Sequence, residues 1–171
     1  TTTSGIVSAS VSVSTGGNSI IDNENIIFTI DNTAPTVSLT DTDSDNLTSG
    51  SSVVTITATF SEAMAVTPTI NITGEVSNVA MTASTTASVW IYPWTVSTTT
   101  SGIVSATVAG TDVSGKAYAG TTSITFTIDN TAPTVTLTDT DSDNLVSGSS
   151  VVTITATFSE AMASAPTINI T

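Results

Sequence analysis

Val53-Val54-Thr55-Ile56-Thr57-Ala58-Thr59-Phe60 is the stretch that decides the fold. Apolar and polar residues alternate along it, and successive side chains of a β-strand point to opposite faces. Val54, Ile56, Ala58 and Phe60 therefore share one face, while the threonines between them share the other. We predict a strand over 53–60 whose apolar side lies on a hydrophobic core.

Short segments of similar composition flank this stretch on both sides. We predict further strands over 36–40, 69–73, 78–84, 88–96, 103–109 and 123–128, each bounded by turn-forming residues. Thr, Val and Ile favour strands, and seven short strands separated by turns are typical of an immunoglobulin-like sandwich. The predicted fold class is all-β, with Ig-like Greek-key sandwiches.

The sequence repeats itself with a period of 98 residues, the interval between Asp31 and Asp129. Asp31 to Thr73 recurs as Asp129 to Thr171 with four differences, at 38/136, 48/146, 66/164 and 67/165. Thr1 to Ala9 likewise recurs as Thr98 to Ala106. We predict the end of one repeat over 1–32, a complete repeat over 33–130 and the start of a third over 131–171, arranged in tandem.

Neither partial repeat has enough strands to close a sandwich, and each would expose sheet edges. We therefore expect one of two arrangements. Either the chain is a section of a longer array, or the strands of 1–32 in one chain complete the strands of 131–171 in another, head to tail.

Composition limits what the chain can bind or catalyse. It has one basic residue, no His, no Cys and a formal net charge of −13. We exclude nucleic acid and anionic membrane surfaces as partners, because there is almost nothing to pair with phosphates. We expect no enzyme, since neither a Ser-His-Asp nor a Cys-His arrangement can be built. No run is long and apolar enough for membrane insertion.

Carboxylates gather where one repeat meets the next. Strand order in the predicted sandwich places loops at its two ends, and each seam collects acidic groups from both partners. One seam is predicted to hold Asp31, Asn32, Glu62 and Asp112, and the other Asp41, Asp43, Asp45, Asp129, Asn130 and Glu160. The run at 41–45 recurs as Asp139, Asp141 and Asp143.

Clustered carboxylates repel one another, and only Lys116 is available to offset them. Ca²⁺ takes six to eight oxygen ligands, so we predict Ca²⁺ at the seams; Mg²⁺ suits them less because it demands a tighter octahedron. Asp-x-Asp-x-Asp resembles the first half of an EF-hand loop, but Asn46 and Ser52 stand where that loop has Gly and Glu. The alternative is a solvated acidic turn in which Asp and Asn act as turn formers.

Trp90, Tyr92 and Trp94 share one face of the predicted strand at 88–96. Facing outward, they would form a row that stacks on sugar rings. Facing inward, they anchor the core, which we favour because aromatic side chains dominate core burial. Pro93 cannot donate to a sheet ladder, so this strand is expected to be an edge strand or to carry a bulge there.

Several segments together resemble bacterial Ig-like (Big) repeats, which build the stalks of giant surface adhesins. They are Val54 to Met64, Thr100-Ser101-Gly102, Gly110 to Lys116, and Phe126 to Val135. Lys116 stands where the family usually has Asn, and the first copy has Thr15-Gly16-Gly17-Asn18 with no counterpart of Asp112.

The resemblance implies a spacer segment of a secreted adhesin at the bacterial cell surface, extracellular, with neighbouring repeats as its partners. We expect Ca²⁺ to stiffen its joints. The alternative function is a carbohydrate-binding module that uses the aromatic row.

Overall fold

The computed structural model describes residues 4–10, 13–15, 18–20, 25–143 and 145–171. It divides into two compact units, Thr1–Asn130 and Thr131–Thr171. All regular structure within the described residues is β-strand, as the alternating pattern predicts. Those residues contain no helix that could cross a membrane.

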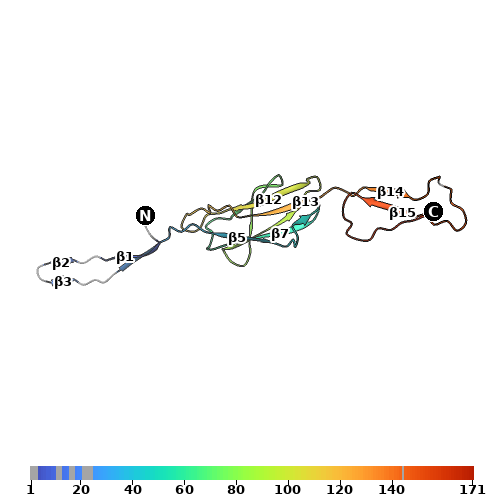
Figure 1. Cartoon of the computed structure of the whole chain (residues 1–171). Helices are drawn as coiled ribbons and strands as arrows, with labels where there is room; N and C mark the ends of the chain where they lie inside the picture. Colours follow the sequence, from blue (N-terminus) through green and yellow to red (C-terminus); the bar gives the residue numbers. More distant parts are fainter. Residues whose placement is uncertain (1–3, 11–12, 16–17, 21–24, 144) are drawn as a thin grey trace. The chain divides into compact units, whose positions relative to one another are not determined.

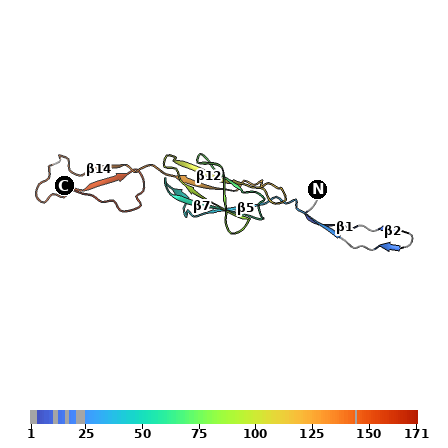
Figure 2. The same cartoon turned by 180° about the vertical axis from the view of Figure 1, so that it is seen from behind.

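A sandwich of two sheets forms the centre of the first unit (Figures 1 and 2). One sheet has the order β10 (Thr82–Ala83), β11 (Val89–Thr95), β7 (Val53–Phe60), β5 (Val37–Asp41). The other has the order β6 (Leu47–Thr48), β13 (Ser123–Ile128), β12 (Gly102–Ala109), β8 (Thr69–Ile72), β9 (Val76–Ala80). The strand order is that of an Ig-like Greek-key sandwich, so the predicted fold class is confirmed. We call residues 37–128 the central sandwich.

Alternation along the strands builds the core as predicted. On β7, Val54, Ile56, Ala58 and Phe60 are all buried, while Thr59 between them is exposed. Residues of β8, β12 and β13 meet them from the opposite sheet. Aromatic rings from the two sheets meet in this core: those of Trp94 and Phe126 lie 5.3 Å apart between their centroids.

Two strand predictions need correction. The single strand expected over 78–84 is two short strands, β9 and β10, which belong to different sheets. Met81 lies between them, 3% exposed, with its backbone N–H bonded to the Pro68 carbonyl at 2.9 Å. The chain crosses from one sheet to the other where the Met81 side chain is buried. The alternation of apolar and polar residues does not indicate this crossover.

The second correction is β6, which the sequence pattern missed. After β5 the chain leaves its sheet and adds Leu47 and Thr48 in parallel to Thr127 and Ile128 of β13. Two residues are too few to show a period, so only the tertiary pairing reveals this strand. The expectation for Pro93 also needs correction: β11 lies between β10 and β7, and Pro93 pairs with Thr55 without a shift in register. Pro93 lies beyond the last β11 residue that pairs with β10, so no hydrogen bond of that ladder is lost.

Separate strand pairs lie outside the central sandwich. In the first unit, β1 (Gly5–Ser10) pairs with β4 (Asn25–Ile30), and β2 (Val13–Thr15) pairs with β3 (Asn18–Ile20). In the second unit, β14 (Val135–Asp139) pairs with β15 (Ile154–Phe158).

By the 98-residue repeat, 167–170 correspond to β8 (Thr69–Ile72), but they form no strand. In the central sandwich, β8 is held between β9 and β12. No such neighbours flank 167–170 among the described residues of their own unit, so their backbone lacks the partners that make a strand.

Replacing Phe126 by Ala should destabilise the central sandwich by about 3–5 kcal/mol, because the cavity left against Trp94 cannot collapse. Denaturant unfolding followed by tryptophan fluorescence measures the loss. Thr127→Ala is the matched control: its side chain is exposed on the next position of the same strand, and the expected change is within about 0.5 kcal/mol. Equal losses for the two variants would contradict the assigned faces of β13.

Candidate metal centre

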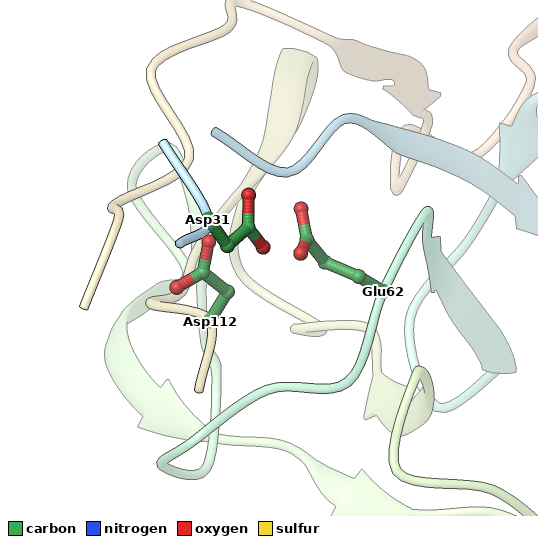
Figure 3. A group of neighbouring side chains, drawn as sticks. All are labelled: Asp31, Glu62 and Asp112. Carbon is green, nitrogen blue, oxygen red and sulfur yellow. The ribbon is translucent and has the colours of Figure 1, made fainter. Parts of the chain in front are cut away.

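Three carboxylates from three separate segments converge at one end of the central sandwich (Figure 3). Asp31 follows β4, Glu62 lies just after β7, and Asp112 lies between β12 and β13. One oxygen from each lies within 4.8 Å of the other two. In the described part of the chain, no other group of three metal-ligating side chains comes this close. These three residues were predicted to lie at one seam, and the structure brings them together.

Hydrogen bonds between the linker and the loop after β7 set the approach of Asp31. The Thr36 N–H donates to Ser61 Oγ at 2.9 Å, and the Ser61 N–H donates to the Thr36 carbonyl at 2.9 Å. Pro35 beside them is buried. Asp31 itself accepts the Thr33 N–H at 2.9 Å, a turn that holds its carboxylate at the start of the linker.

Asp112 is the most constrained member of the group. It is fully buried, and its Oδ1 accepts three hydrogen bonds: from the Ser114 N–H at 2.8 Å, Ser114 Oγ at 2.7 Å and the Lys116 N–H at 2.8 Å. Gly115, with φ of 87°, lets the chain turn tightly enough for this. Its Oδ2 is buried and has no hydrogen-bond partner among the described residues.

The half-satisfied carboxylate of Asp112 fits a cation. Burying a carboxylate oxygen without a partner is costly, and hydrogen bonds alone leave Oδ2 uncompensated. A hard divalent ion close to Oδ2, with Asp31 and Glu62 as further oxygen ligands, would supply the missing interaction. The contribution of Lys116 to the group is its backbone N–H rather than its charge.

The pKa values of Asp112 and Glu62 are shifted in opposite directions. Burial alone would raise the pKa of Asp112, but the hydrogen bonds from Lys116 and Ser114 hold it below its ordinary value. Burial, the charges of Asp112 and Asp31, and a hydrogen bond with Asp31 raise the pKa of Glu62. Without a cation, Glu62 therefore takes up a proton more readily than Asp112.

The acidic run at the end of β5, which is Asp41, Asp43 and Asp45, forms turns in the structure. Asp41 Oδ1 accepts the Asp43 N–H at 2.8 Å, and Asp45 Oδ1 accepts the Leu47 N–H at 3.1 Å. These are the turns of the alternative interpretation, and the three carboxylates do not converge as the triad does. Residues 42–46 leave the strand for bends, so the shared face that a strand would give alternate residues is lost here.

Residues at the end of β13 lie close to that run. Asp43 and Asp129 line one hollow together with Thr48 and Ser52. The Asn130 side chain accepts the Gly50 N–H at 2.6 Å and donates to the Ser97 carbonyl at 2.9 Å. Asn130 therefore fastens the end of the sandwich, and its role as a cation ligand stays a prediction. Asn32, its counterpart, donates its backbone N–H to Ser4 Oγ at 2.8 Å.

The second unit repeats the turn geometry. Asp139 Oδ1 accepts the Asp141 N–H at 2.8 Å, and Asp143 Oδ1 accepts the Leu145 N–H at 3.1 Å. Glu160 is half-buried, and its Oε1 has no hydrogen-bond partner among the described residues. That Glu160 joins Asp129 and Asn130 in a site stays a prediction.

The aromatic row faces the core. Trp94 is 1% and Trp90 8% exposed, and Tyr92 is half-buried. Trp90 Nε1 donates to the Ala87 carbonyl at 3.1 Å. The exposed row needed for the carbohydrate-binding alternative is therefore absent, because the apolar rings are buried between the sheets.

The predicted site did not include its supporting residues Ser114 and Gly115. The signal was present in Asp112-Val113-Ser114-Gly115, a turn sequence in which the Asp accepts backbone N–H groups further along. No family model, curated protein or solved structure matches the chain, so the site rests on its own geometry.

Asp112→Asn should weaken Ca²⁺ binding at least about 100-fold, because a unit charge close to a cation near a protein surface is worth roughly 4 kcal/mol. The substitution keeps the Oδ1 acceptor and hence the turn. Calorimetric titration measures the affinity. Asp45→Asn removes the same charge from an exposed position outside the triad and should leave the affinity within about threefold. Equal effects of the two variants would contradict the triad as the binding site.

Calcium affinity should fall as the pH drops through the raised pKa of Glu62, which lies above its ordinary 4.5. Binding at that pH must expel the proton, so titrations in buffers of different ionisation enthalpy should show a proton release that declines as the pH rises above the raised pKa. Glu62→Gln, which cannot titrate, should abolish the release.

Without calcium, the same groups influence folding in opposite directions. The raised pKa of Glu62 stabilises the folded protein below 4.5, and this contribution is lost as the pH rises through the raised value. The lowered pKa of Asp112 stabilises it above 3.8, and this contribution is lost as the pH falls through the lowered value.

For the binding prediction, a Ca²⁺ affinity that does not change with pH across the acidic range would count against Glu62 as a ligand.

Proposed function

We propose that the chain is a spacer segment from the stalk of a bacterial surface adhesin, extracellular, whose joints are stiffened by Ca²⁺. The proposal rests on which segments of the chain supply the three carboxylates. Asp31 belongs to the segment that joins β4 to β5, whereas Glu62 and Asp112 belong to loops of the central sandwich. An ion bound by all three ties the joint to the sandwich.

A hydrogen-bonded clamp prepares the joint for the ion. The exchange between Thr36 and Ser61 recurs between Thr134 and Ser159, with the Thr134 N–H to Ser159 Oγ at 2.9 Å and the Ser159 N–H to the Thr134 carbonyl at 3.0 Å. Each linker is thus fixed to the sheet that follows it. The remaining freedom lies before the clamp, at Asp31 and its neighbours, where the cation would act.

The composition of the chain supports a bound ion rather than a disulfide at this joint. The chain has no Cys, so disulfides are excluded. Extracellular calcium modules bind with dissociation constants of about 10⁻⁴ to 10⁻³ M, a range that a partly exposed site with three carboxylates suits. Two chain features support the array: the 98-residue repeat, and the recurring clamp.

Calcium should both stabilise the protein and narrow the motion of the joint. A ligand that binds only the folded form adds about 2.7 kcal/mol at a hundredfold excess over its dissociation constant, and thermal unfolding with and without chelator measures this. For the motion, cysteines placed at Ser8 on β1 and Thr125 on β13 can be labelled uniquely in this Cys-free chain. The distribution of distances between the labels should narrow with Ca²⁺.

Asp112→Asn in the labelled chain is the control for this experiment. It should keep the broad, calcium-independent distribution while the central sandwich stays folded. If chelator alters neither the unfolding temperature nor the label distances in the unmodified chain, the calcium-stiffened joint is wrong.

A further inference from the structure

Asn130, with which the chain leaves the central sandwich, is held by two loops at that end. Its Oδ1 accepts the Gly50 N–H at 2.6 Å, and its Nδ2 donates to the Ser97 carbonyl at 2.9 Å and to the Thr100 carbonyl. Its backbone N–H donates to Ser101 Oγ at 3.2 Å. We call these four hydrogen bonds the exit latch. All its partners lie in the central sandwich, so the latch needs no cation.

The two loops are themselves fixed where Asn130 contacts them. Glu75 Oε2 accepts the Ser97 N–H at 3.1 Å, so the Ser97 backbone is held by hydrogen bonds on both its N–H and its carbonyl. A Cβ atom at Gly50 would lie 2.6 Å from the Thr98 Cα and 2.9 Å from the Asn130 Oδ1. Only glycine allows this close approach, so the loops are built to receive the Asn130 side chain.

Part of the latch recurs at the preceding joint. The Asn32 N–H donates to Ser4 Oγ at 2.8 Å, as the Asn130 N–H donates to Ser101 Oγ. Ser4 and Ser101 hold the same place in the repeated segments 1–9 and 98–106. The contact therefore belongs to the repeat and is not peculiar to one loop.

The hydrogen-bonded clamp at Thr134 fixes the other end of the same linker. Thr131, Ala132 and Pro133 are all that lies between the latch and the clamp. Proline has a fixed φ, and the residue before it is confined to extended conformations. The linker between its two fixed ends is thus short, and its last two residues are stiff.

We propose that Asn130 sets the direction in which the linker leaves the central sandwich, and that bending of the joint is confined to residues 131–133. The importance of such a joint rests on the proposed spacer function, whereas the latch itself acts without Ca²⁺. At the joint that carries the triad, Ca²⁺ would act on the bending that the equivalent residues 33–35 still allow.

The latch requires an amide and not merely a side chain of that size. An amide offers both an acceptor oxygen and two donor hydrogens, and Asn130 uses both kinds of group. A carboxylate of the same shape has no donor, so it would face the Ser97 and Thr100 carbonyls without a hydrogen bond. Asn130→Asp should therefore open the latch as fully as Asn130→Ala does.

Distances between spin labels on cysteines at Thr59 and Ala132 test the proposal in the whole chain, in chelator. Thr59 is exposed on β7 and Ala132 is exposed in the linker, and the chain has no Cys of its own. The distance distribution should be narrow in the otherwise unmodified chain and should broaden with either Asn130 variant. Both labels precede the clamp, so the outcome depends neither on the second unit nor on the ion. Unchanged distributions in both variants overturn the proposal.

Hydrogen exchange at Gly50 measures the latch locally. Its N–H should exchange about fivefold faster in Asn130→Ala, the effect of losing about one net hydrogen bond. Fluorescence of the buried Trp94 reports whether the sandwich stays folded. If Asn130→Ala does not fold, Ser101→Ala, which removes one bond of the latch, should still broaden the label distances. An unchanged exchange rate in a folded Asn130→Ala contradicts the latch.

Asn71→Asp and Asn71→Ala are the matched controls. Asn71 is exposed on β8 of the same sandwich and lies outside the latch. The two substitutions make the same changes of charge and size as those at Asn130, and neither should alter the label distances. Equal broadening by Asn71→Asp and Asn130→Asp would mean that added charge, and not the lost amide donors, loosens the linker, which would contradict the proposal.

Discussion

Trp94 and Phe126 meet at 5.3 Å between two sheets whose inward positions are almost all apolar. Burial of these alternate side chains is the constraint on which the other features depend. It fixes which strand ends lie together, and so brings the loops after β7 and β12 to the same end of the sandwich. The carboxylates of Glu62 and Asp112 are neighbours because the core holds the strands that carry them.

At that end of the sandwich, the interactions of charged groups replace apolar burial as the main contribution to the energetics. Asp112 is held as an anion by three hydrogen bonds to one oxygen, while its other oxygen has no described partner. Glu62 and Asp31 add negative charge beside it. A group so arranged is unfavourable alone and favourable around a cation, which makes the joint a natural place for control by an ion.

Identical residues take different environments in this protein according to what lies beside them. Phe126 is fully buried and Phe28 is half exposed, although both occupy the same position in the same register. The strand pairs form from local pairing, whereas burial requires a second sheet. Pairing and burial are thus separable here, and the uncovered pairs keep the apolar surface that a sandwich would use.

The sequence by itself determined the all-β class, the inward faces of 53–60 and 123–128, and the meeting of Asp31, Glu62 and Asp112. The class and the inward faces follow from a period of two, which is a local property, and the meeting of the carboxylates follows once the strands take the order of an Ig-like sandwich. Tertiary structure alone decided that 78–84 divides between sheets at Met81 and that Leu47–Thr48 pairs with β13. Each depends on which backbone groups and cavities other segments offer, and no period in the sequence encodes that.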